Sequence, residues 1–220
     1  MNIVFKVYFA GALFNHKDLI GNAQLASHIN QHSEGRYQCI LPQDLEQTTG
    51  KSLDIRNQDL KQVIECDLAI FNFDGTELDS GTVVEFMLAK FLDIPSVIIR
   101  SDFRTGGDQD KDGDDWNLMC SFYPRTHKVQ FNAMACYQQA VRESDSLNEA
   151  MDNLYSKIAS ILIGGLDLVR KIPPLPKGDK NQEEALYEWA LKFLGSDLEK
   201  LVSQSALEKL LATKREKGLV

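Results

Sequence analysis

Short apolar runs and amphipathic stretches alternate along the first 131 residues. Apolar runs of this length are typical of parallel strands buried on both faces. They predict five strands, at residues 3–9, 37–41, 67–73, 95–100 and 128–131. Apolar residues at helical spacing predict helices at 16–32, at 53–65 and from residue 82 up to Pro95, with a short one at 116–122. This alternation predicts an α/β fold, a doubly wound, mostly parallel five-stranded sheet with helices on both faces.

The pattern changes after residue 132. Residues 133–170 predict one continuous helix, residues 171–178 form a Pro-rich break, and residues 181–217 predict one or two amphipathic helices interrupted near Gly195. We therefore expect an α/β domain at residues 1–140 and a helical extension at 141–220, with a break near 171–180. The apolar stripe of the extension favours packing on the domain or on a partner chain over a cofactor site.

Composition narrows the classes of function. The net charge of the 220-residue chain is −8 and no basic residues cluster, which disfavours nucleic-acid binding. Four cysteines without CxxC spacing favour free thiols in a reducing cytosol. The chain starts almost directly with a strand and contains no run of about 18 apolar residues, so we expect a cytoplasmic protein with no signal peptide and no membrane span.

The loop and helix that follow the third strand carry four carboxylates: Asp74, Glu77, Asp79 and Glu85. Open α/β sheets place their ligand crevice at the carboxyl ends of their strands. Gly81 leaves room for a small group beside Glu85, and Asp79 lies six residues earlier in the chain, so two carboxylates can face one space. Asp59, Asp74 and Glu77 are also carboxylates, and spacing alone does not choose among them.

Glu85 has two interpretations. The sequence Thr82-Val-Val-Glu85 is a capping box, in which Glu85 bonds back to the helix start. Alternatively, a helix N-terminus keeps Glu85 ionised while partial desolvation lets Asp79 hold a proton. One ionised and one protonated carboxylate is the pairing used in retaining glycosyl transfer.

Three further features bear on ligand or metal binding. Gly11, flanked by alanines directly after the first strand, allows either close approach of a ligand or a tight turn. The acidic segment from Asp108 imitates a calcium loop, but Met119 stands where the bidentate carboxylate is needed. His28 and His32 are four residues apart without a third ligand. We expect no metal and no cofactor, and a mobile acidic loop at residues 101–115.

Four pieces of the chain together resemble the nucleoside 2-deoxyribosyltransferases. They are the run from Val7 to Phe14 (VYFAGALF), Asp59, the segment from Asp79 to Glu85 (DSGTVVE) and the segment from Trp116 to Met119 (WNLM). The resemblance covers about residues 3–137 and implies a flavodoxin-like sheet and a homo-oligomer with shared active sites.

The resemblance also implies roles for single residues. Glu85 would be the nucleophile that forms a covalent 2-deoxyribosyl ester, and Tyr8 would orient it. Asp79 and Asp59 would contact the nucleobase, with Asp79 as proton donor. The remaining implied contacts are Gln43 with the base and Asn117 with the sugar of a neighbouring subunit's site.

The chain departs from the family pattern in two places. Family members often end in a short tail that touches the 5′-hydroxyl of the sugar, whereas this chain continues for about 80 residues. The loop at 101–115 is unusually acidic and would repel a 5′-phosphate, which favours nucleosides over nucleotides.

We therefore expect an enzyme that moves the 2-deoxyribosyl group of a 2′-deoxynucleoside to a free nucleobase. An N-glycosidase of the same fold and a non-catalytic nucleotide-sensing or assembly module are the alternatives.

Overall fold

A computed structural model describes residues 3–45, 51–176 and 179–220, and its centre is a parallel β-sheet. The strands are β1 (Phe5–Ala10), β2 (Tyr37–Ile40), β3 (Leu68–Asn72), β4 (Ser96–Arg100) and β5 (Thr126–Gln130). Their order is β2-β1-β3-β4-β5, and each neighbouring pair is parallel. This order confirms the expected flavodoxin-like, doubly wound sheet, with its switch point between β1 and β3.

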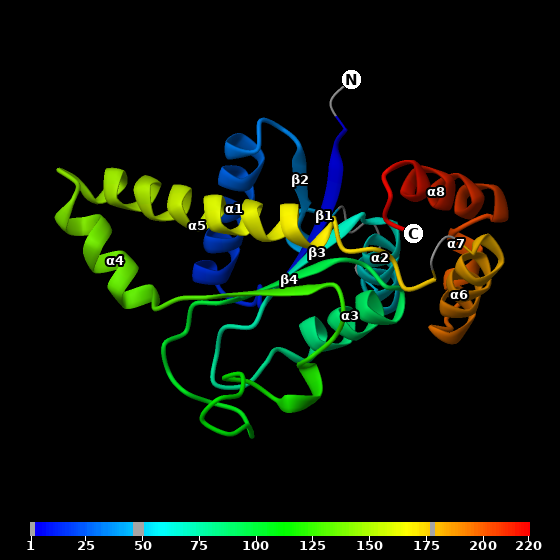
Figure 1. Ribbon diagram of the computed structural model, residues 1–220, viewed down its shortest axis with the longest axis horizontal. Coiled ribbons are helices and arrows are strands. Elements are labelled where there is room, and N and C mark those ends of the chain that lie inside the picture. The colour runs from blue at the N-terminus through cyan, green and yellow to red at the C-terminus, as the bar shows by residue number, and fades with distance from the viewer. Residues whose placement is uncertain (1–2, 46–50, 177–178) are drawn as a thin grey trace.

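Helices cover both faces of the sheet (Figure 1). In chain order they are α1 (His16–His32), α2 (Ser52–Glu65), α3 (Ser80–Phe91), α4 (Ala133–Arg142), α5 (Leu147–Val169), α6 (Lys180–Phe193), α7 (Leu198–Leu201) and α8 (Gln204–Glu216). Short 3₁₀ turns occur at Pro42–Asp44 and Leu118–Cys120. Helices α1 and α5 pack on one face of the sheet, and α2, α3 and the last three helices contribute to the core on the other.

Four predictions about the extent or number of helices are wrong. Residues 133–170 form two helices, because Ser146 starts α5 by accepting a hydrogen bond from the Glu149 amide. The helix expected at 116–122 is the 3₁₀ turn Leu118–Cys120. Helix α3 begins at Ser80, two residues early, and the C-terminal part holds three helices rather than one or two.

Alternating strand residues build the two cores. Along β1, Tyr8 and Ala10 belong to the core under α2 and α3, whereas Val7 and Phe9 belong to the core under α1 and α5. This follows from the period of two in a strand, in which successive side chains point to opposite faces. Tyr8 is therefore directed toward the helix that carries Glu85.

The C-terminal helices complete the core on the α2–α3 side. Tyr187, Leu198 and Leu211 are fully or almost fully buried there, and each such side chain contributes about 1.5–3 kcal/mol when it leaves water. The division of the chain at residue 140 stays a prediction, although the extension shares the core of the sheet.

Buried polar contacts also hold the C-terminal end. Arg125 binds the Asp93 carboxylate at 2.7 Å and donates to the Leu219 carbonyl at 3.0 Å. Lys217 pairs with Asp67 at 2.6 Å, and the buried Lys214 donates to the Cys66 carbonyl. The end of the chain is thus fixed near the start of β3, whereas the acidic loop follows the opposite end of the neighbouring strand β4.

The cysteines form no disulfides among the described residues, and two of the histidines contribute to helix packing. All four cysteines are free, with Cys66 and Cys120 buried. His28 and His32 of α1 stack on each other, and His28 Nε2 lies 3.1 Å from Asp152 Oδ1 of α5. The contact between His28 and Asp152 thus joins the two helices. Within the three described segments, no helix is long and apolar enough to cross a bilayer.

Candidate active site

The site begins with a hydrogen bond between residues 77 positions apart. The Tyr8 hydroxyl on β1 donates to Glu85 Oε1 on α3 at 2.6 Å. Tyr8 is completely buried, and Glu85 is partly buried in the second turn of the helix. The strand fixes the tyrosine and the helix fixes the glutamate, so the carboxylate has a defined orientation at the carboxyl end of the sheet.

Burial sets the ionisation of this pair. Desolvation raises the pKa of Glu85 to about 7, and the charges of Asp59 and Asp79 add to the rise, while the hydrogen bond from Tyr8 opposes it. Burial and the nearby glutamate raise the pKa of Tyr8 well above its ordinary value. Tyr8 therefore stays protonated and acts as a donor, and Glu85 changes charge near neutral pH.

Glu85 opens into a cavity of about 420 Å³ between α2 and α3. Asp59 and Arg56 line it from α2, and Gly81 and Val84 line it from α3. Burial raises the pKa of Asp59 to about 6. The cavity thus contains two carboxyl groups that can each hold or release a proton close to pH 7.

Asp79 caps α3, which corrects the expected capping box. The Asp79 side chain accepts from the Thr82 amide at 2.8 Å through Oδ2, and the same oxygen accepts from the Thr82 hydroxyl at 2.9 Å. The helix therefore starts at Ser80, and Glu85 bonds to Tyr8 rather than back to the helix start. An aspartate is a favoured N-cap residue, because its carboxylate accepts a hydrogen bond from a main-chain amide of the first turn that has no partner within the helix. Here that amide belongs to Thr82.

The expected ionisation of the two carboxylates is also corrected in part. The helix N-terminus was expected to keep Glu85 ionised, but burial outweighs it and raises the pKa of this residue. Asp79 was expected to hold a proton. Its Oδ2 accepts two hydrogen bonds from Thr82, and the proton on Asp79 stays a prediction.

Two of the other predicted residues lie outside this cavity. Gln43 donates to the Leu19 carbonyl at 2.8 Å, which fastens the 3₁₀ turn to α1. Its Oε1 is buried and has no partner among residues 3–45, 51–176 and 179–220. At Gly11 a Cβ would come within 3.0 Å of Asn72 Cβ. A small residue therefore suits the close packing of two strand ends at this position.

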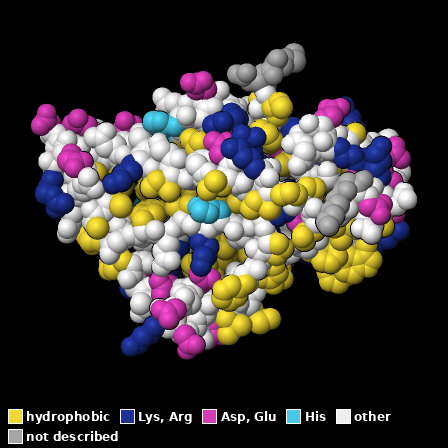
Figure 2. Space-filling model, viewed as in Figure 1, with side chains coloured by type: hydrophobic (Ala, Val, Ile, Leu, Met, Phe, Trp, Pro, Cys, Tyr) yellow, Lys and Arg dark blue, Asp and Glu magenta, His cyan; other side chains and the backbone are white. Residues whose placement is uncertain are grey.

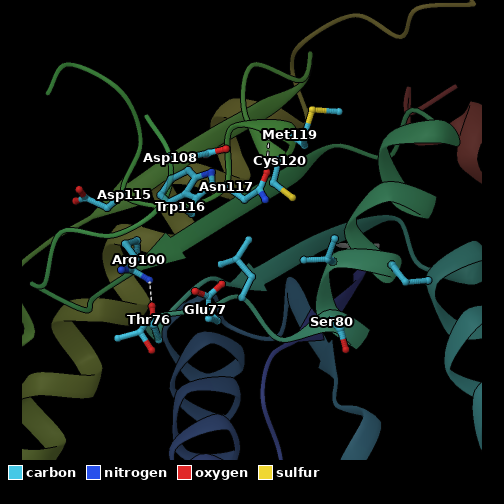
Figure 3. A pocket seen from close by; sticks show the side chains of 15 residues that line it. Thr76, Glu77, Ser80, Arg100, Asp108, Asp115, Trp116, Asn117, Met119 and Cys120 are labelled. Carbon is cyan, nitrogen blue, oxygen red and sulfur yellow. Dashed lines mark hydrogen bonds between the residues drawn. The ribbon is translucent and has the colours of Figure 1, made fainter. Parts of the chain in front are cut away.

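Asn117 lines a second and larger cavity of about 670 Å³ on the other side of α3 (Figure 3). Glu77 and Ser80 border it from the start of α3, and Asp108 and Trp116 border it from the long loop. Asn117 itself caps the 3₁₀ turn by accepting from the Met119 amide at 2.9 Å. Val84 lines both cavities, so a single helix separates Asn117 from Glu85 within one chain.

The acidic loop after β4 makes specific contacts, and its expected mobility stays a prediction. Asp74 accepts from the Ser101 hydroxyl at 2.6 Å and from the Asp102 amide at 2.8 Å. Asp108 accepts from the Leu118 amide, and the buried Arg100 donates to the Gly75 carbonyl at 2.7 Å. Asp74 is thus a loop-forming residue, and the loop faces the larger cavity.

Over the described segments, no three His, Cys, Asp or Glu side chains lie close enough together to hold a metal ion. The smaller cavity presents two carboxyl groups, those of Asp59 and Glu85. A carboxylate held by a tyrosine can attack an electrophilic carbon, and a second carboxyl group can give or take a proton.

Arg56 was not among the site residues predicted from the sequence. It lines the Glu85 cavity three residues before Asp59, on the same side of α2. Helical spacing alone places residues three apart on neighbouring positions of one face, so the relation to Asp59 was visible in the sequence. Nothing in the sequence marked that face of α2 as part of a cavity.

The chain is similar to several proteins of known structure. Solved structures with similar folds include a conserved protein from Enterococcus faecalis, 24% identical over 77% of this chain and 97% of that one, with a TM-score of 0.43. A 2-desoxiribosyltransferase from Leishmania mexicana is 20% identical over 56% and 89%, with a TM-score of 0.45. A CMP N-glycosidase from Clostridium botulinum is 13% identical over 63% and 99%, with a TM-score of 0.37.

A search of curated proteins gave no match. The family profile described as nucleoside 2-deoxyribosyltransferase matches residues 7–119. That range begins at the strand that carries Tyr8 and contains Asp59, Asp79 and Glu85. Because the match covers more than half of the 220 residues, the chain belongs to the nucleoside 2-deoxyribosyltransferase family.

Proposed function

We propose that the protein transfers the 2-deoxyribosyl group of a 2′-deoxynucleoside to a free nucleobase. The observation that carries the proposal is the 2.6 Å hydrogen bond from Tyr8 to Glu85 at the edge of a cavity that Asp59 also lines. Family membership supports the substrate class, and the hydrogen bond from Tyr8 supports Glu85 as a nucleophile with a defined orientation.

In the first step, ionised Glu85 attacks C1′ of the nucleoside. The bond from Glu85 oxygen to C1′ forms while the bond from C1′ to the base nitrogen breaks, and the electron pair leaves with the base. Tyr8 donates to Oε1, which leaves Oε2 as the attacking oxygen. A hydrogen bond that stabilises the carboxylate keeps a larger fraction of Glu85 ionised at neutral pH.

The departing base needs a proton. We assign this proton to Asp59, because burial raises its pKa to about 6 and it lines the cavity with Glu85. A carboxyl group with a pKa near the working pH can both give and take the proton. Asp79, the donor first expected, keeps its proposed place near the base, but its Oδ2 is engaged by Thr82.

The second step reverses the first with a new base. The incoming base nitrogen attacks C1′, Glu85 leaves as a carboxylate, and Asp59 takes back a proton. Two inversions at C1′ retain the β-configuration. Hydrolysis is the competing outcome, in which water takes the place of the second base.

Product analysis distinguishes transfer from hydrolysis. Incubation of 2′-deoxyinosine with adenine should yield 2′-deoxyadenosine and hypoxanthine, whereas 2′-deoxyinosine alone should be stable. Release of hypoxanthine at the same rate without adenine, and with no new nucleoside, would show a hydrolase. No turnover under either condition would support the non-catalytic module.

The covalent step has a direct test. A 2′-fluoro-substituted arabinosyl nucleoside slows breakdown of the ester, so mass spectrometry of the protein should find one fluorinated pentosyl adduct on Glu85. Glu85→Gln is the matched control, because it keeps an oxygen for the Tyr8 hydrogen bond but removes the nucleophile. An equal adduct on the variant would remove Glu85 from the mechanism.

Nucleosides are the proposed substrates rather than nucleotides. Asp59 and Glu85 line one cavity, and Glu77, Asp108 and Asp115 line the other. Carboxylates on both sides of α3 disfavour a 5′-phosphate dianion near the site. We expect the 5′-monophosphate of 2′-deoxyinosine to be a poorer substrate than 2′-deoxyinosine, measured as kcat/KM at pH 8.

We also propose that the active form is a homo-oligomer. Val84, Met87 and Phe91 form an exposed apolar stripe along α3, and Trp189 and Phe193 of α6 extend it. The ring centroids are 4.8 Å apart for Phe91–Trp189 and 4.6 Å apart for Trp189–Phe193. Figure 2 shows apolar side chains gathered at the lower right, where α6 lies in Figure 1. A continuous exposed apolar patch is typical of a protein–protein interface, and this one starts at the wall of both cavities.

A further inference from the structure

The α2 wall of the Glu85 cavity is tied to the C-terminal extension. Arg56 Nη2 donates to the Leu194 carbonyl at 2.9 Å, and Asn57 Nδ2 donates to the Ser196 carbonyl at 3.0 Å. Arg56 Nη1 also donates to Asn57 Oδ1 at 2.9 Å. Two consecutive residues of α2 thus bind two carbonyls of the turn between α6 and α7.

That turn has an unusual backbone. Gly195, Ser196 and Asp197 have φ values of 64°, 56° and 59°. Left-handed conformations cost roughly 1–2 kcal/mol for each residue with a side chain, and they persist where surrounding contacts fix them. The conformation presents the Leu194 and Ser196 carbonyls to α2. The turn therefore places both carbonyls within hydrogen-bond distance of Arg56 and Asn57.

The charge of Arg56 is not paired by these contacts. Its two acceptors are an amide oxygen and a main-chain carbonyl, both neutral. Asp59 lies one turn further along the same face and lines the same cavity. Among residues 3–45, 51–176 and 179–220, the guanidinium thus has neutral acceptors and no carboxylate partner, at the rim of a cavity that also contains two carboxyl groups.

The position of Arg56 identifies the part of the substrate that it meets. Side chains three residues apart on a helix have Cβ atoms about 5–6 Å apart. A base that receives a proton from Asp59 therefore has its far edge within reach of Arg56. A phosphate is the poorer occupant, because Asp59 and Glu85 line the same cavity. Nucleobases present carbonyl oxygens and ring nitrogens, which accept hydrogen bonds from arginine.

We propose that Arg56 binds an acceptor atom on the edge of the nucleobase, and that the α6–α7 turn of the C-terminal extension holds Arg56 in place for this contact. This inference rests on the proposed function, since it places the base beside Asp59. Arg56 is a substrate-binding residue in this scheme, and Asn57 and the turn are positioning elements.

The test compares Arg56→Ala and Arg56→Lys with the wild-type chain at pH 8. Loss of a hydrogen bond from a charged donor weakens binding about tenfold or more. Arg56→Ala should therefore raise the KM for adenine and the calorimetric Kd of free adenine about tenfold, with a much smaller change in kcat. Arg56→Lys should recover part of the affinity. Arg142→Ala, an exposed arginine on α4, is the control and should change neither quantity.

A double-mutant cycle tests the role of the turn. Asn57→Ala removes the acceptor that orients Arg56 and the donor to Ser196, so it should raise the Kd of adenine less than Arg56→Ala does. The double variant should bind adenine no more weakly than Arg56→Ala alone, because both changes act through one guanidinium. Additive losses in binding would show that Asn57 does not act through Arg56. Thermal unfolding of each variant separates loss of fold from loss of binding.

The outcomes for this inference and for the proposed function are separable. Adenine binding that Arg56→Ala weakens, without any exchange, would sustain the role of Arg56 and overturn the transferase. Exchange with an unchanged KM and Kd in Arg56→Ala would overturn the role of Arg56 and leave the transferase intact. Absence of adenine binding by the wild-type chain would overturn this inference.

Discussion

Removal of the Tyr8 hydroxyl should move the pH dependence of activity. In the wild-type chain the pKa of Glu85 is about 7, and the hydrogen bond from Tyr8 is the one contact that lowers it against burial and two neighbouring carboxylates. Tyr8→Phe keeps the ring in the core but removes the donor. The ionised carboxylate loses its partner, so the pKa of Glu85 should rise and the nucleophile should be protonated over a wider range of pH.

The size of the effect follows from the hydrogen bond. A bond to a charged group is worth about 1.5–3 kcal/mol, and one pKa unit corresponds to about 1.4 kcal/mol. We take the lower end, because water can reach the partly exposed Glu85, and expect a rise of about one unit. The ionised fraction at pH 7 then falls from about one half to about one tenth, which lowers kcat/KM about fivefold at pH 7.

The assay is the pH profile of kcat/KM for base exchange between pH 5 and 9.5. The acid limb of Tyr8→Phe should lie about one unit higher than that of the wild-type chain, and the two profiles should converge above pH 9. Asp79→Asn is the opposing control, because asparagine can still cap α3 while the variant lacks a charge that raises the pKa of Glu85, so its limb should move to lower pH. A Tyr8→Phe profile reduced by the same factor at every pH would refute the role of this bond in ionisation.

Three further outcomes are expected. Glu85→Gln should stabilise the fold by about 2 kcal/mol at pH 8 and by little at pH 4, in chemical denaturation, because a raised folded pKa gives stability that is lost as pH rises from 4.5 through 7. Equal effects at both pH values would contradict this. Trp189→Glu should shift the oligomer toward monomer in sedimentation, while Leu147→Glu, an exposed leucine on α5, should not. Asp93→Ala should destabilise the fold by about 3–5 kcal/mol, because it leaves Arg125 buried without a counter-charge, and unchanged thermal unfolding would show that the pair is not stabilising.

The sheet and its helices were predictable because their signals are local. The apolar runs gave all five strands, and α1 was predicted from His16 to His32 as the structure has it. The errors occur where two local signals compete. Asp79 and Thr82 can both cap a helix, and the structure uses Asp79. No proline or glycine marks the break before Ser146, so the apolar stripe of α5 concealed it.

The site was predictable only in its parts. Asp79 and Glu85 stand close in sequence, but the contact between Tyr8 and Glu85 joins two elements that no spacing relates, and the resemblance alone pointed to it. The pKa values of Asp59 and Glu85 depend on how much surface each loses on folding. A sequence pattern does not give that quantity, and the expectation that the helix N-terminus would decide the ionisation of Glu85 was wrong for this reason.

Burial connects the C-terminal extension with the proposed chemistry. Leu60 on α2 lines the Glu85 cavity and also belongs to the core that Tyr187 and Leu191 of α6 complete. The extension therefore removes water from the side of α2 that faces the core, while its turn binds Arg56 on the side that faces the cavity. Low local polarity keeps the pKa of Asp59 near neutrality and strengthens the hydrogen bond between Tyr8 and Glu85. Helix α2 carries Asp59 and Arg56, and it also contacts the extension. Substitutions in the last 42 residues should therefore alter the pKa of Asp59 and the position of Arg56 more than they alter Glu85 on α3.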